Sequence, residues 1–321
     1  MRYFGSTSMV FFAAVWCTTA LAQTGPALLL KPNLSEQETL EARGDALWLQ
    51  SGSTSNNGEH FQLGVFEWTG RIREQRENFI PRLGWDVLYL NVNTSDPVLP
   101  DKGLTDVSIA AGVELGTYSG WRSGLTVGIG YAGDTPFGEG DAWYGKATLL
   151  VGREIDDKTK IGVVLDYDGN RTFLPDIPLP GFAYIHEFDP HLSYTIGVPV
   201  TAITWKPYTP VSLDVTWTLL DRFDARLEYK LSPQWTAYGA LEDRQEAFHV
   251  ENLEGHDRLL FEQRRVELGV VWQPWQHTRF HLAGGYAWGQ DFSVGWDLRN
   301  SHPIADVSDE PYVRIGFERR W

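Results

Sequence analysis

The sequence predicts an all-β fold, a transmembrane antiparallel up-and-down β-barrel of about 14 strands within a range of about 12 to 16. Three observations predict this fold. Apolar residues alternate with small or charged residues along most of the chain, the connections between alternating segments are in turn short and long, and Trp and Tyr stand at both ends of the segments. A barrel in a bilayer explains all three, because its outer surface is apolar while its interior is polar.

The composition excludes several other classes of protein. The 321 residues include 42 Asp and Glu against 27 Lys and Arg, which gives a formal net charge of −15. This balance argues against a nucleic-acid partner, because phosphate binding needs clustered basic residues. A hydrophobic content of 42% excludes a disordered chain, and a single Cys excludes a disulfide framework.

The N-terminus has the features of a cleaved signal peptide over residues 1–22. Arg2 gives a basic start, an apolar stretch follows, and Ala-Leu-Ala at 20–22 is a small-x-small cleavage site. Acylation of Cys17 is the alternative, but Trp16 precedes it where a small residue is normally required. The predicted sequence of regions is therefore a signal peptide at 1–22, a short periplasmic segment at 23–45 and the barrel at 46–321.

Alternation is clearest at 107–115 and 121–131, where one face is apolar and the other carries small or charged residues. Many segments reach about 10 to 13 residues, roughly twice the length of strands in soluble proteins. The alternative, a soluble β-sandwich, has shorter strands and no reason for Trp at both strand ends. Further alternating segments lie at 60–70, 79–91, 143–151, 161–167, 192–198, 211–219, 223–231, 266–272, 280–288 and 313–321.

The connections fall into two groups that alternate along the chain, as in bacterial outer-membrane barrels with short periplasmic turns and long outer loops. The short ones contain residues 117–120, 154–158, 206–210, 231–234 and 273–277. The long polar ones contain residues 51–59, 92–103, 132–141, 169–181, 243–258 and 289–310. Aromatic residues flank both groups, which predicts two interfacial girdles.

The last ten residues, 312–321, resemble the C-terminal assembly signal of bacterial outer-membrane proteins. They alternate, contain Gly316 and Phe317, and end in the aromatic Trp321, although Arg319 stands where the family has a hydrophobic residue. In its layout the whole chain is similar to uncharacterised outer-membrane barrel families known as domains of unknown function. The resemblance implies location in the bacterial outer membrane, with the lipid bilayer and the barrel-assembly machinery as partners. It implies no substrate.

No catalytic, cofactor or metal site is predicted. The glycine pattern at 128–133 lacks the following helix that a dinucleotide site requires, and Asp166 to Asn170 lack the rest of a calcium loop. His277 and His281 are ~13 Å apart on a strand, too far to share one metal ion. We therefore predict no enzyme. The alternative, a hydrolase at the outer rim, would use His249 or His256.

The inward faces carry charges of both signs, which predicts ion pairs within the lumen. The predicted lumen-facing residues are Arg82, Asp86, Asp106, Glu114, Arg122, Lys146, Asp166, Asp214, Arg226, Glu228, Arg265 and Glu267. The leading hypothesis is a passive channel or uptake barrel for a small solute. The alternative is a structural or surface-interaction barrel that binds a partner through its long loops, above all through the acidic loop at 243–258.

Overall fold

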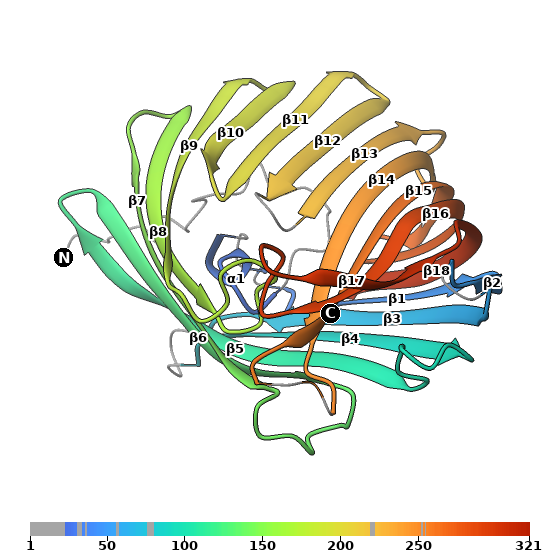
Figure 1. The fold of residues 1–321 in the computed structure, drawn as a ribbon. Coiled ribbons are helices and arrows are strands. Elements are labelled where there is room, and N and C mark those ends of the chain that lie inside the picture. The colour runs from blue at the N-terminus through green and yellow to red at the C-terminus, as the bar shows by residue number, and fades with distance from the viewer. Residues whose placement is uncertain are drawn as a thin grey trace, which may run out of the picture.

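The protein folds into one closed antiparallel β-barrel in a computed structural model, viewed along the barrel in Figure 1. Sixteen strands close the barrel, which confirms the fold class and lies within the predicted range of strand number. Two short strands, β2 and β17, extend its rim, and the helix α1 lies inside the ring of strands (Figure 1). The structure describes residues 23–30, 34–35, 37–55, 58–75, 80–218, 222–251, 253 and 255–321.

The elements follow one another with few interruptions. In chain order they are α1 (Ala27–Leu30), β1 (Leu40–Leu49), β2 (Gly52–Ser53), β3 (His60–Ile72), β4 (Arg82–Thr94), β5 (Gly103–Tyr118), β6 (Trp121–Gly133), β7 (Trp143–Glu154), β8 (Thr159–Asp168), β9 (Leu179–Asp189), β10 (Leu192–Val198), β11 (Val200–Tyr208), β12 (Val211–Thr218), β13 (Arg222–Lys230), β14 (Trp235–Phe248), β15 (Arg258–Trp275), β16 (Thr278–Gly295), β17 (His302–Val307) and β18 (Glu310–Arg320). Each barrel strand pairs with its neighbours along the chain, and β18 closes the ring on β1, where Val313 lies opposite Trp48.

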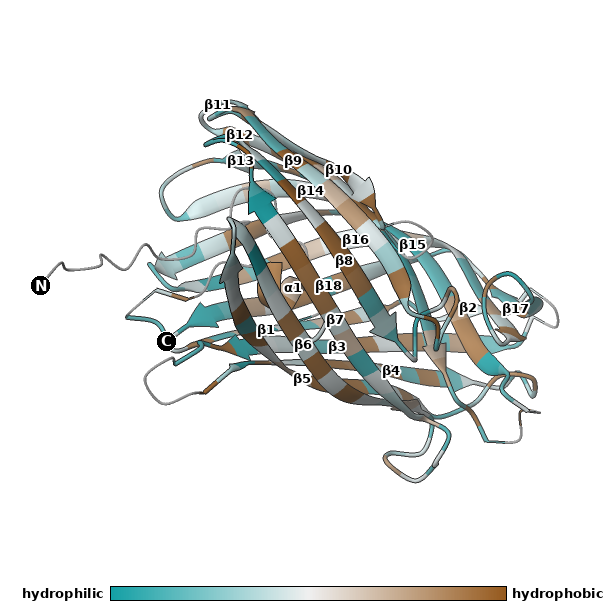
Figure 2. Cartoon of the chain, turned by 90° about the vertical axis from the view of Figure 1, so that its left-hand side faces the viewer, coloured by the Kyte–Doolittle hydropathy of each residue, from teal (hydrophilic) through white to brown (hydrophobic). Residues whose placement is uncertain are grey.

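The outward face is apolar where it would meet lipid, as Figure 2 shows by the brown bands across β5 to β8. On β6, Val127 and Ile129 are half exposed on the outside of the barrel, and Leu268 on β15 is 74% exposed. Such a continuous apolar surface is stable in lipid and costly in water. Among the described residues, no helix is long and apolar enough to cross a bilayer.

The barrel is taller on one side than on the other. β15 and β16 each contain 18 residues, whereas β10 to β13 contain between 7 and 9. The extra length lies at the end with the long connections, which we call the long-loop end; the opposite end is the short-turn end. Inside the tall side, apolar residues such as Leu47, Phe61 and Leu90 form a buried core with Phe292, whose ring lies 5.9 Å from that of Phe61.

Four of the 16 barrel strands, β1, β9, β11 and β14, have no counterpart among the alternating segments that the sequence predicts. β9 and β11 lack clear alternation, because Ile185 and Ala202 are buried on the inward face beside Leu30. The barrel also begins at Leu40 rather than at residue 46. The predicted signal peptide at 1–22 lies outside the described residues.

A charge on the outward face is expected to destabilise the barrel. Val127 lies between the aromatic residues that flank β6 and is 52% exposed, so Val127→Arg should lower the free energy of unfolding by about 2–4 kcal/mol. Urea unfolding in lipid vesicles, followed by Trp fluorescence, measures the loss. Val127→Leu is the control and should change little; an equal effect of both substitutions would contradict lipid exposure at this position.

Candidate functional site

Two large cavities lie in the lumen, one toward each end of the barrel. The short-turn cavity has a volume of about 500 Å³ and is lined in part by Lys206, Lys230 and Arg279. The long-loop cavity has a volume of about 320 Å³ and is lined in part by Asp106 and Lys146. Both cavities are bordered largely by charged and polar side chains, as a water-filled interior requires.

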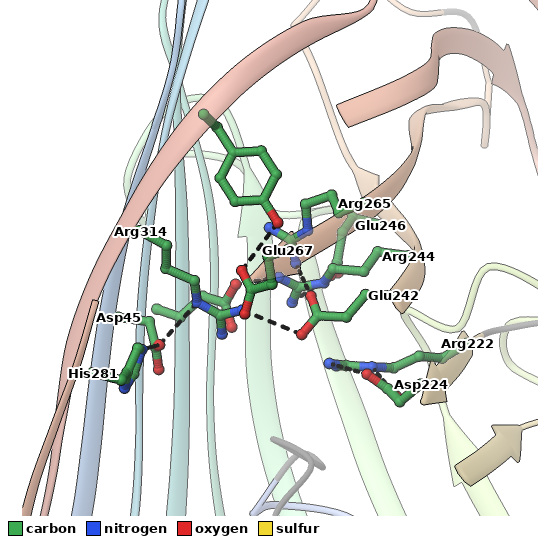
Figure 3. Close-up of polar contacts among 12 residues, drawn as sticks. Asp45, Arg222, Asp224, Glu242, Arg244, Glu246, Arg265, Glu267, His281 and Arg314 are labelled. Carbon is green, nitrogen blue, oxygen red and sulfur yellow. Dashed lines mark hydrogen bonds and ion pairs between the residues drawn. The ribbon is translucent and has the colours of Figure 1, made fainter. Parts of the chain in front are cut away.

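A network of ion pairs lies inside the barrel (Figure 3), and we call it the central network. It consists of Asp45, Glu242, Arg265, Glu267 and Arg314. Arg314 donates from Nε to Asp45 Oδ1 over 3.0 Å and from Nη1 to Glu242 Oε1 over 3.2 Å, while Arg265 Nη2 lies 2.5 Å from Glu242 Oε2. Each member is largely buried.

The central network is completed by residues that face the cavities. On the short-turn side, Arg43 donates to Asp45 over 2.8 Å, and His281 Nε2 lies 2.5 Å from the other oxygen of the same carboxylate. Both Arg43 and His281 line the short-turn cavity. On the other side, Arg244 pairs with Glu67, and both line the long-loop cavity. The network therefore connects the walls of the two cavities and separates one from the other.

Some of these pairs join strands that are not neighbours in the sheet, whereas the pairs of Glu242 with Arg265 and of Asp45 with Arg314 join neighbouring strands. Arg314 lies on β18 and Glu242 on β14, which are separated in the sheet by β15 and β16. Glu67 on β3 and Arg244 on β14 are separated by still more strands. Ion pairs between strands that are not neighbours project into the lumen and reduce the open cross-section of the barrel.

Two predicted lumen-facing residues, Arg265 and Glu267, belong to the central network, where Glu267 accepts hydrogen bonds from the hydroxyls of Tyr238 and Tyr312 at 3.0 Å each. The others form separate contacts, as follows. Two of them accept hydrogen bonds: Asp106 from the Tyr144 hydroxyl over 2.6 Å and Asp214 from the Thr204 hydroxyl over 2.8 Å. Others form ion pairs, namely Lys146 with Asp168 at 3.0 Å, Asp166 with Arg171 at 2.7 Å, Arg226 with Glu228 at 2.7 Å and Glu114 with Arg82 at 3.8 Å. Arg122 lies opposite Thr117 and Gly152 in the sheet.

Sequence reasoning missed Asp45, Glu67, Glu242, Arg244 and Arg314. Glu242 and Arg244 were placed in an acidic loop at 243–258, but β14 continues to Phe248 and β15 begins at Arg258. Their i, i+2 spacing is the signal that could have found them, because it continues the inward positions Tyr238 and Ala240 of the same strand.

The segment from Gln23 to Leu30 lies inside the barrel, whereas the sequence placed it in the periplasm. Asp86 accepts hydrogen bonds from the backbone nitrogens of Gln23 at 2.8 Å and Thr24 at 3.0 Å. The Thr24 hydroxyl donates to Asp86 over 2.7 Å and lies 2.8 Å from the hydroxyl of Ser108. The physical reason is the wall itself, which presents a carboxylate to backbone donors that must be satisfied when buried.

The connections at the long-loop end contact one another. Lys102 Nζ lies 2.6 Å from Asp134, whose carboxylate also accepts from the backbone of Glu251 at 3.2 Å. Burial opposes ionisation of Asp134, but the hydrogen bonds from Lys102, Glu139 and the Glu251 backbone, together with the charge of Lys102, lower the pKa of this carboxyl. Burial, together with the neighbouring Asp134, raises the pKa of Glu139 to about 7. The two carboxyls thus share a proton near neutral pH, which limits repulsion where these loops meet.

The predicted assembly-signal residues lie along β18 and at the C-terminus. Gly316 lies so close to His281 that a Cβ added there would meet the His281 ring at 2.3 Å. Phe317 and Trp321 are about two-fifths exposed on the outside of the barrel. The backbone nitrogen of Trp321 donates to Leu40 over 2.9 Å, so that the last residue extends the pairing between the first and last strands.

Removing the buried Arg314 guanidinium should lower the free energy of unfolding far more than removing an exposed guanidinium. Arg314→Leu leaves Asp45, Glu242 and Glu267 buried without this partner and should lower the free energy of unfolding by about 3–5 kcal/mol. The control is Arg264→Ala, whose side chain is 52% exposed and lies 3.5 Å from Asp243; it should cost about 0–1 kcal/mol. Urea unfolding in vesicles compares the two, and equal losses would show that the central network adds no stability.

Comparisons with known proteins find barrels of the same general kind. No family model matches the chain, and no curated protein matches it. Among solved structures, it is similar to the toluene transporter TbuX of Ralstonia pickettii, with 10% identity and a TM-score of 0.40 over 95% of this chain and 96% of that one. An outer membrane channel from Pseudomonas putida F1 has 11% identity and a TM-score of 0.36, with 90% and 97% covered.

The β domain of the Bordetella autotransporter BrkA gives 11% identity and a TM-score of 0.33 over 88% of this chain and all of that one. Likeness at this level adds nothing to what the strand pairing shows directly. The closed sheet, the apolar outward face and the polar interior are the properties that a bilayer demands of a spanning sheet. The chain is an outer-membrane β-barrel.

Proposed function

We propose that the barrel is a passive channel for small polar solutes. The observation that carries the proposal is the pair of cavities, each lined by many charged and polar residues, inside a closed barrel of 16 strands. A barrel of about 16 strands is wide enough to leave an aqueous channel, whereas one of about 8 strands is filled by its own side chains. The central network narrows this lumen, so that only small solutes can pass between the cavities.

The charges in the lumen bear on the class of solute. Three basic residues, Lys206, Lys230 and Arg279, line the short-turn cavity and are exposed. The acidic residues Glu228 and Glu318 line it as well. The long-loop cavity has more carboxylates than basic groups in its lining. A permeating ion therefore meets electrostatic fields of opposite sign in the two cavities, one after the other. This supports weak overall selectivity between anions and cations.

A catalytic role has little support. His249 is one of the two residues considered for a hydrolase. Its backbone N–H donates to the Ala132 carbonyl over 3.0 Å, and burial lowers the pKa of its imidazole. We infer that His249 helps to hold two loops together. Loss of any lipid or peptide hydrolysis on replacing it would contradict this view.

Partner binding through the loops is the second candidate function. The acidic loop predicted at 243–258 supports it less than the sequence suggested, because Glu242, Arg244 and Glu246 lie within β14 and line or border the lumen. Hydrogen bonds between the loops favour it: buried Arg258, at the start of β15, donates to the carbonyls of Trp296 at 2.7 Å and Arg171 at 3.0 Å, which ties two connections to the end of one strand. Capture of a partner that is lost on deletion of the loops, with folding intact, would favour it over the channel.

Single-channel recording in planar bilayers tests the channel. The refolded protein should conduct, and Lys230→Glu should shift the reversal potential in a KCl gradient toward cation selectivity, because it replaces a positive charge at the short-turn cavity. The matched control is Lys158→Glu, the same charge change in the turn between β7 and β8, outside the cavity lining. An electrically silent barrel, or equal shifts for both variants, would contradict the proposal.

We also propose that the C-terminal strand is recognised by the barrel-assembly machinery through Trp321. Its side chain faces outward and is 41% exposed, and the Arg319 guanidinium lies 5.1 Å from its ring. Trp321→Ala keeps the backbone pairing with Leu40, so refolding in detergent should be unchanged while assembly in cells falls. Heat-modifiable gel mobility measures both. Trp275→Ala, which changes an aromatic residue at the short-turn end of β15, is the control and should assemble normally.

A further inference from the structure

We propose that residues 23–30, which we call the plug, are a displaceable gate of the lumen. The inference rests on the proposed channel function and adds its regulation. The plug enters the ring of strands and carries α1 (Figure 1). Gly25, Pro26 and Ala27 form part of the lining of the long-loop cavity, so the plug closes that cavity on one side.

The wall has a seat that matches the plug in shape. A Cβ added to Gly84 would lie 2.0 Å from the Gln23 carbonyl oxygen, and one on Gly112 would lie 3.3 Å from the side chains of both Leu28 and Leu29. Gly124 is similarly close to Leu29, at 3.2 Å. Three inward glycines on the neighbouring strands β4, β5 and β6 thus leave the hollow in which two leucine side chains are held.

The seat also matches the plug in hydrogen bonding. Asp86 accepts the backbone donors at the start of the plug, as described above, and Arg82 donates to the Leu28 carbonyl over 3.2 Å at its end. Arg82 also lies 3.6 Å from Glu74 and 3.8 Å from Glu114 in the wall itself. Since these carboxylates remain when the plug leaves, Arg82 keeps ionic partners in the open state, which lowers the cost of opening.

The plug spans the lumen from one wall to the other. From its seat on β4 to β6, it reaches across so that Leu30 packs against Ile185 on β9 and Ala202 on β11. A small apolar cavity of about 70 Å³ remains beside Pro26 and Leu30 at this far wall. Contact with the far wall is therefore incomplete, while contact with the glycine seat is close.

Few interactions hold the plug apart from those with its seat. α1 has only 4 residues, and its internal hydrogen bonds are those of Leu28 to Gly25 and of Leu29 and Leu30 to Pro26, each at 3.1 Å. An isolated helix of this length is not stable in water. The plug therefore loses its structure when it leaves the seat, and segments of this kind open at low free energy relative to the whole fold.

Signal cleavage would strengthen the closed state. Cleavage after Ala22, as the sequence predicts, makes the Gln23 nitrogen an α-amino group, and this nitrogen lies 2.8 Å from Asp86 Oδ1. An ammonium at this place forms a charge-assisted bond with the carboxylate, stronger than the bond of a neutral amide. Export would thus deliver the barrel with its gate closed.

A reversible disulfide tests the gate. The hydroxyl oxygens of Thr24 and Ser108 are 2.8 Å apart, near enough for the double variant Thr24→Cys with Ser108→Cys to form a bond of about 2.05 Å. In planar bilayers, the oxidised protein should conduct several-fold less than the same protein after reduction. The single variants are controls for pairing with Cys17 and should not respond to reduction. Equal conductance before and after reduction would overturn the gate.

Deletion of residues 23–30, with residues 1–22 kept, separates the gate from the channel. The deletion should raise conductance several-fold above that of the full chain. If both proteins conduct equally, the channel stands and the plug is not a gate; if neither conducts, the channel itself is wrong. Gly112→Leu, which fills the seat while keeping the whole chain, should open the lumen as the deletion does and replaces it if the deleted chain fails to fold.

Discussion

Backbone hydrogen bonding in lipid is the constraint on which the structure depends. A bilayer core offers no water to unpaired N–H and C=O groups, so a spanning sheet must close on itself. Here closure rests on β18, which pairs with β16 on one side and with β1 on the other. The last residue therefore completes the barrel, and the polar interior, the cavities and the plug exist only once that pairing has formed.

Closure also determines how the interior is stabilised. The outward face is in contact with lipid, so the specific packing that a soluble protein places in an apolar core lies inside the barrel, where Arg314 binds Asp45 on the neighbouring β1 and Glu242 on the more distant β14. Buried ion pairs add little net stability over apolar packing, but breaking one partner is costly. Such a network fixes the spacing of opposite walls, and a narrow lumen of defined shape is the result.

The sequence predicted the barrel, because alternation survives wherever one face meets lipid and the other is polar, as along β5 and β6. It failed where that contrast disappears. Ile185 and Ala202 are apolar on the inward face because Leu30 packs on them, and no pattern local to β9 or β11 shows this. The charges near Glu242 resembled a solvated loop because the partners Arg265 and Arg314 come from other strands.

Distances across the lumen depend on strand number and tilt, which alternation alone does not fix. For that reason no spacing in the sequence indicates that Arg244 meets Glu67, or that Leu28 and Leu29 meet three glycines. The individual residues were within reach of sequence reasoning, since glycines and charges on inward positions are visible, but their assembly into a network and a seat required the closed ring.

The unequal strand lengths have a consequence for how solutes reach the lumen. β15 and β16 exceed β10 to β13 by about ten residues, or roughly 25 Å along the axis at ~3.3 Å per residue and a tilt of ~40°. The rim at the long-loop end is therefore oblique, and its lower edge is formed by β10 to β13. A mouth with such a rim opens toward the membrane surface on its low side, while the tall side screens it from bulk solution.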